Sequence, residues 1–414
     1  MTSPLIWLAI GSIILVAGSR GVQRARRMFP VMRVLGGGWA LLGFGVLVGP
    51  HAIGVFDDER LMQVQPIVLI LLTWAGIVIG VQCRARFIIA IPRALWKWIG
   101  LDLFIGLLLS VVAAGLIARI WQPDSPAAAH ILLSGTFAAF ALGWNPESRS
   151  LGSRTDAPAV RMAVLVQAGA GMLAICTVVV SSLALQSGYE DAQGSVVFAP
   201  AGGMLALAME LCAVCVVALG AREILRDSRE DDARTTLITI GALCILSGVA
   251  VSFGGSPLLT GLLFGAAIGL SRRRLRTLEH LISSAEPAVA SGCFFFAGMT
   301  LALPQQSTTL IGGLAVGAIV LLLALARRVL KPLMMNLALS RERESVAIDS
   351  CAARAPVRQA PLTIIVLLAF AIHDSSGIAD ELLGVATLIA LASIALTFFP
   401  RMPREAHASM RVPV

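Results

Sequence analysis

The sequence predicts an all-α polytopic membrane protein, a single membrane domain over residues 1–414 with about thirteen transmembrane helices, and three observations support this. Hydrophobic residues make up 57% of the chain and charged residues 14%, whereas soluble domains are about half apolar and a quarter charged. Apolar runs of roughly 17 to 22 residues recur along its whole length, each long enough to cross the hydrocarbon as a helix. Arginines and acids alternate in the loops between these runs.

The first run begins at Pro4 with no basic flank before it and no small-residue cleavage site after it, so we expect a span and not a removed signal peptide. The predicted spans cover residues 4–19, 31–50, 64–82, 98–118, 127–143, 158–185, 197–219, 235–253, 256–271, 286–303, 307–326, 360–373 and 382–399.

The loop charges fix the orientation of these spans. Loops after the odd-numbered spans are rich in arginine, in groups that begin at Arg20, Arg84, Arg149, Arg222, Arg272, Arg327 and Arg401. The opposite loops carry acids, among them Asp57, Asp124, Glu190, Asp374 and Asp380. Because cytoplasmic loops are enriched in Lys and Arg, this alternation predicts an outside N-terminus and a cytoplasmic C-terminus in a plasma membrane, the inner membrane of a bacterium. The net charge of +8 then reflects orientation in a lipid bilayer, and no nucleic-acid partner is expected.

An internal repeat is visible across these spans. Gly45 and Gly49 of the second span match Gly265 and Gly269 of the ninth, about 220 residues later. Pro66 likewise matches Pro287, and 74–76 matches 296–298. Copies an odd number of spans apart cross in opposite directions, so we expect an inverted repeat with copies at 31–185 and 254–400 and linking helices at 197–253. The alternative is that glycine-rich helix interfaces look alike anywhere in membranes.

Two of these segments carry a family resemblance. The pattern from Leu41 to Pro50, which closes with Gly49-Pro50, and the pattern Phe294-Phe295-Phe296-Ala297-Gly298-Met299 resemble the early glycine-rich helix and the later Phe-Phe-x-x-Gly-Met helix of the monovalent cation:proton antiporter superfamily. The resemblance implies an inverted-repeat fold with panel and core bundles, a homodimer, exchange of Na⁺ or K⁺ for protons, and no cofactor.

The sixth span departs from that family. Such antiporters carry an aspartate in the middle of this span, and here the matching position is Ala168 or Gly169. A bare cation in a low-dielectric site needs compensating charge, and exchange with protons needs a group that titrates. Neither alanine nor glycine supplies these.

The clearest substitute is Glu210, which lies within the apolar run 204–219. Charged residues inside spans are expensive and are functional candidates. Glu210 is either a relocated proton-binding carboxylate or a structural acid paired between helices. If ions are exchanged, it would act together with the polar groups of Gln167, Thr136 and Asn145. Asp102, near the start of the fourth span, is expected at the interface between membrane and water, and His373-Asp374 is expected in an outer loop.

No nucleotide-binding loop, zinc-protease motif or serine-hydrolase elbow is present, so enzymatic chemistry and metal sites are not expected. Cys212 and Cys215 have metal-ligand spacing, but mid-span they are predicted to be small core residues. The remaining hypotheses are a cation:proton antiporter or a degenerate form of it, a non-transporting sensor, scaffold or regulator with an antiporter fold, and a carrier of another small solute.

Overall fold

 

The computed structural model describes Ser12, 39–50, Gly54, Phe56, 58–82, Phe104, Leu108, Val112, 188–190, 196–198, 200–227, 232–269, 275–300, Ile365, Leu368, Ala369 and Ile372.

Within these residues the protein forms six helices and one hairpin. The helices are α4 (Trp39–Val48), α5 (Asp58–Gln82), α11 (Pro200–Asp227), α12 (Asp232–Ser252), α13 (Pro257–Gly269) and α14 (Leu275–Thr300). Each helix overlaps one of the predicted spans. The other predicted spans, and with them the count of thirteen, lie largely outside the described residues.

Two features differ from the sequence prediction. Helix α14 begins at Leu275, well before the predicted start at 286, because Leu275, Leu278 and Ile282 recur at helical spacing and extend the helix with an apolar stripe. A two-stranded antiparallel hairpin, which the sequence reading did not predict, precedes α11. It pairs β1 (Gly188–Glu190) with β2 (Val196–Phe198), with Tyr189 opposite Val197.

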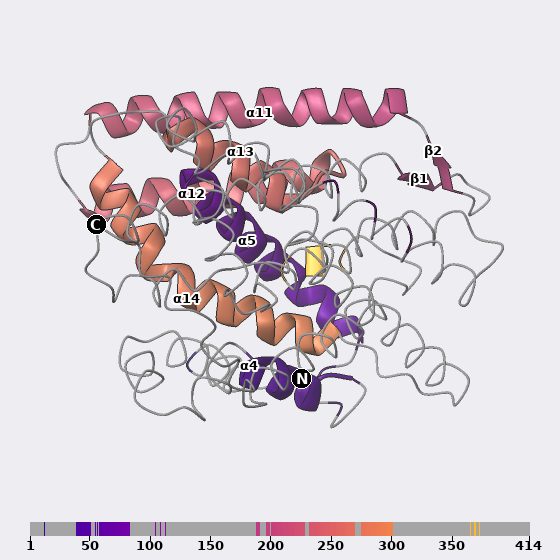
Figure 1. Ribbon diagram of the computed structural model, residues 1–414. Coiled ribbons are helices and arrows are strands. Elements are labelled where there is room, and N and C mark those ends of the chain that lie inside the picture. Colours follow the sequence, from indigo (N-terminus) through magenta and orange to yellow (C-terminus); the bar gives the residue numbers. More distant parts are fainter. Residues whose placement is uncertain are drawn as a thin grey trace, which may run out of the picture.

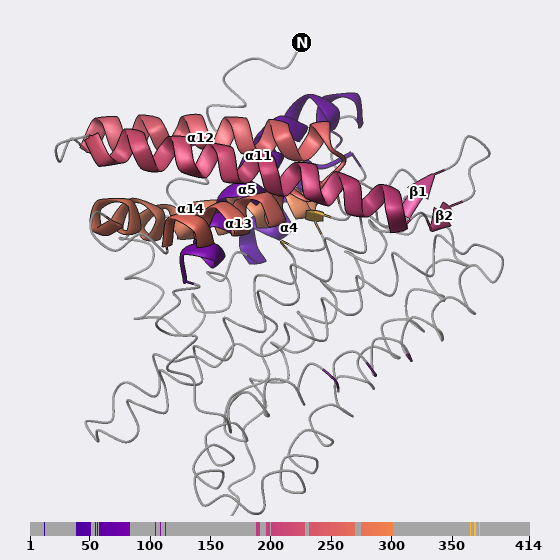
Figure 2. The ribbon, with the colours of Figure 1, turned by 90° about the horizontal axis from the view of Figure 1, so that it is seen from above.

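The helices pack in two groups around α5 (Figure 1). Helices α11 and α12 lie side by side along one edge, as the view from above also shows (Figure 2), and both contact α13. Helix α13 packs along α5, and α14 contacts both α4 and α5. Helix α5 therefore joins the α11–α12 edge to the α4–α14 pair.

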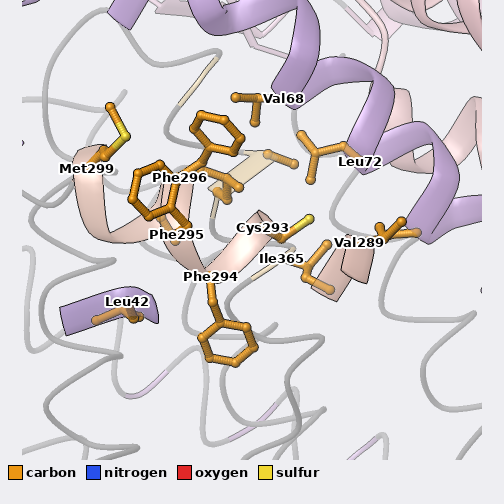
Figure 3. Packing of buried hydrophobic residues seen from close by; sticks show 14 of the residues in the cluster. Leu42, Val68, Leu72, Val289, Cys293, Phe294, Phe295, Phe296, Met299 and Ile365 are labelled. Atoms are coloured by element: carbon orange, nitrogen blue, oxygen red, sulfur yellow. The ribbon is translucent and has the colours of Figure 1, made fainter. Parts of the chain in front are cut away.

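The buried side chains form two clusters that meet at α5. One cluster is centred on Phe294, Phe295 and Phe296 of α14, with the Phe295 and Phe296 rings 5.4 Å apart and edge to face (Figure 3). The second joins α5 to α11, α12 and α13 and includes Leu243 and Leu246. Trp74 of α5 packs against both clusters. Aromatic pairs in this geometry add about 0.5–1.5 kcal/mol to the burial of their area.

Glycines bring the helix backbones together at two crossings. Where α4 meets α14, a methyl group at Gly45 would overlap the Phe295 carbonyl oxygen, and one at Gly298 would overlap the Leu42 carbonyl oxygen. Where α13 meets α5, a methyl group at Gly80 would overlap the carbonyl oxygen of Leu262. A methyl group at Gly265 would lie 3.0 Å from the Val81 amide nitrogen. Small residues that allow such close approach are typical of helix interfaces in membranes.

The outer faces of the described helices are apolar. Leu205 and Val216 of α11 are 68% and 69% exposed, and Leu237 of α12 is 74% exposed. Two described helical segments, Gln63–Val81 and Thr235–Ser252, are long and apolar enough to cross a membrane, and the apolar segment Pro257–Ile268 is shorter.

Candidate functional site

Glu210 is the one charged residue among the buried side chains of the described part of the chain. It is fully buried on α11, whereas its neighbours Met209 and Leu211 are about half exposed. Val214 and Ala218 follow it at intervals of one helical turn and are also buried. Glu210, Val214 and Ala218 therefore form an inward-facing stripe on α11, and Glu210 is the first of the three.

The turn between α12 and α13 lies against this carboxylate. Helix α12 ends at Ser252, and Gly254 in the following turn lies in the left-handed region at φ 63°. The Gly255 amide donates to the Ala250 carbonyl at 2.7 Å. The Gly254 amide donates to the Val251 carbonyl at 3.2 Å. This pair of hydrogen bonds is the Schellman arrangement, which satisfies carbonyls left over at a helix end.

Helix α13 starts directly after this turn. Pro257 occupies its first position, where a missing N–H is harmless, and the amides of Leu259 and Thr260 donate to the Ser256 carbonyl at 2.9 and 3.1 Å. The amino end of a helix carries partial positive charge, which favours a nearby carboxylate.

Gly255 and Glu210 approach closely. A methyl group at Gly255 would overlap Oε2 of Glu210 and would lie 2.7 Å from its Cδ atom. Glu210 also takes part in a polar interaction with the rest of the protein. The carboxylate therefore lies against the backbone of the turn, and a methyl group at position 255 would require the Glu210 side chain to shift.

Three buried threonine hydroxyls of the described helices bond within their own helices. Thr73 donates to the Leu69 carbonyl at 2.8 Å, and Thr239 donates to the Thr235 carbonyl at 2.8 Å. Thr260 donates to the Pro257 carbonyl at 2.9 Å. Such back-bonding satisfies the donor of a hydroxyl without a partner on another helix.

The cysteine prediction was wrong. Cys212 and Cys215 are exposed on α11, because the buried stripe that contains Glu210 and Val214 lies on the opposite side of the helix. Across the described segments, no three His, Cys, Asp or Glu side chains are grouped so that they could hold a metal ion.

Most of the candidate path predicted from the sequence lies outside the described residues. This applies to Gln167, Thr136 and Asn145, and to Ala168 and Gly169 in the place of the family aspartate. Asp102, His373 and Asp374 also lie outside them. Glu210 is the candidate that the structure places, and the sequence reading missed its contact with Gly255. The run Gly254-Gly255-Ser256-Pro257 between two apolar segments does signal a tight turn.

The fold is similar to that of a sodium proton antiporter. The solved structure of the sodium proton antiporter MjNhaP1 from Methanocaldococcus jannaschii is similar to this protein, with a TM-score of 0.60 over 95% of this chain and 96% of that chain. The two sequences are 15% identical. No protein-family model matches the sequence. No curated protein matches it by sequence either.

Proposed function

We propose that the protein is a secondary transporter that exchanges a monovalent cation, Na⁺ or K⁺, for protons. The observation that carries the proposal is the fold match to a sodium proton antiporter, which extends over nearly the whole of both chains. Fold alone does not determine activity, so the proposal also draws on the membrane character and the internal repeat of the sequence.

Membrane insertion is supported by the outer surface. Leu205 and Val216 of α11 and Leu237 of α12 are more than two-thirds exposed, and side chains of this kind are stable when they face lipid tails. The arginine-rich loops support an N-terminus outside and a C-terminus in the cytoplasm of a plasma membrane.

We further propose inverted repeats at 31–185 and 254–400, joined by helices at 197–253. The glycine crossings support this architecture: if α4 corresponds to α13 and α5 to α14, the α4–α14 contact becomes the α13–α5 contact. Under that correspondence Gly45 is equivalent to Gly265, and Gly298 is equivalent to Gly80. Gly80 lies one helical turn after Gly76, the residue that the match between 74–76 and 296–298 pairs with Gly298. Panel and core bundles and a homodimer complete the proposed assembly.

The exchange would use polar groups around the sixth span. Gln167, Thr136 and Asn145 offer oxygen ligands to a cation, and Glu210 is the buried acid that could titrate. Ala168 and Gly169 offer neither function, so a site in this protein must differ from the usual one of the family.

The test is proton flux in proteoliposomes, followed with a pH-sensitive dye under Na⁺, K⁺ and Li⁺ gradients. An antiporter gives cation-dependent flux above that of empty liposomes, and Gln167→Leu lowers it. Absence of flux for all three ions, with folded protein inserted in the membrane, would contradict exchange of these cations.

A second candidate is a non-transporting sensor, scaffold or regulator with an antiporter fold, or a carrier of another small solute. It is favoured by Ala168 and Gly169 in the place of the titrating aspartate. A folded protein without cation-dependent flux is the result that supports it.

A further inference from the structure

We propose that Glu210 is a positioning residue whose carboxylate fixes the Gly254–Gly255 turn, and through it the amino end of α13, against α11. This gives the buried acid a role in the architecture of the helix bundle, besides the titration proposed above. It goes beyond the proposed function, since the anchor holds whether or not the protein transports.

Burial is the first argument. A carboxylate removed from water is strongly destabilised unless polar groups of the protein compensate it. Glu210 is 0% exposed at the head of an otherwise apolar stripe of α11, and it takes part in a polar interaction with the protein. Its carboxylate lies against Gly255 in the turn before α13. The amino end of a helix carries partial positive charge, which stabilises a carboxylate beside it.

The closeness of the contact is the second argument. Gly255 leaves no room for a methyl group between its backbone and the carboxylate. Gly255 does not require a glycine for its own conformation, because Gly54 and Gly254 are the glycines with positive φ in the described part of the chain. The small residue at 255 is therefore explained by the approach of Glu210.

The position of α13 depends on its contacts with two other helices. Gly261 and Gly265 hold one side of α13 against α5. The Glu210 contact holds its amino end against α11, so that the helix is fixed from two directions.

Thermal unfolding of the purified full chain in detergent tests the anchor. Gly255→Ala is expected to lower Tm by about 3 °C or more, and Glu210→Ala to lower it as well. The double variant is expected to melt no lower than the less stable single variant, because the methyl group then has no carboxylate to meet. Additive losses would overturn the proposal. Gly248→Ala is the matched control, since a methyl group there meets nothing within 4 Å.

Transport provides a second readout, which rests on the proposed function. Glu210→Gln keeps the shape and an acceptor oxygen but cannot titrate. We therefore expect it to keep the native Tm while the cation-dependent flux falls, because Glu210 is the acid proposed to titrate. A Tm of Glu210→Gln as low as that of Glu210→Ala would overturn the anchor, whatever the flux. If the native protein shows no flux, the proposed function fails, and the melting experiment alone decides the anchor.

Discussion

Gly254 lies in the turn between the end of α12 and the start of α13, and its backbone has φ 63°. An L side chain in this region loses roughly 1–2 kcal/mol, so Gly254→Ala is expected to destabilise the protein by about that amount. Gly248→Ala lies within the exposed face of α12, where replacing glycine in a helix gains about 1 kcal/mol. Melting temperatures in one detergent should therefore fall for the first variant and stay level or rise for the second. Equal shifts would contradict the account of the turn.

The sequence allowed Glu210 to be selected as a candidate functional residue, but it did not predict which residues Glu210 contacts. A lone acid in an apolar run indicates burial, and the structure confirms that Glu210 is buried. Its contact with Gly255 depends on how α11 packs on the α12–α13 turn, and no local pattern in either segment specifies that packing. The periodicity of α11 also did not separate the Glu210 face from the Cys212 face, because the exposed face is as apolar as the buried one.

The crossing of α4 and α14 depends on glycine at a single face of α4. Gly45→Ala would place a methyl group on the Phe295 carbonyl oxygen, and such overpacking typically costs about 1–3 kcal/mol. Gly43→Ala is the matched control on the same helix, because a methyl group at Gly43 meets nothing within 4 Å. We expect a lower Tm for Gly45→Ala and a native Tm for Gly43→Ala. A native Tm for both would show that the two helices separate easily.

At the scale of helices and strands, the hydrophobic runs predicted where the helices lie more accurately than they predicted where each helix begins and ends. The apolar core of α14 was predicted, but its first three turns were not, because a run that includes Arg276, Glu279 and His280 does not resemble a span. The hairpin was missed for a related reason. Strands of three residues are too short to show alternation, and β1 pairs with β2 through backbone hydrogen bonds that the side chains do not specify.

For the whole molecule, an antiporter fold was inferred from two loose apolar motifs, and the similarity to MjNhaP1 confirms the fold. The motifs were informative because their glycines make backbone contacts: Gly45 of the first motif and Gly298 of the second meet at one crossing. Such contacts tolerate few substitutions, whereas the apolar residues around them can vary with little effect on packing.

The orientation of the whole molecule is the last prediction, and it follows from the arginine-rich loops. The test uses single cysteines introduced into a variant without the seven native ones. A cysteine in place of Ala192, next to the acidic pair Glu190-Asp191, should react from outside intact cells. A cysteine in place of Ser228, beside Arg226 and Arg229, should react only after permeabilisation. A membrane-impermeant maleimide distinguishes the two. Because α11 alone connects β2 to this arginine-rich segment, labelling of both positions in intact cells would mean that α11 does not cross the bilayer. The N-outside, C-inside arrangement would then be wrong from the seventh span onward.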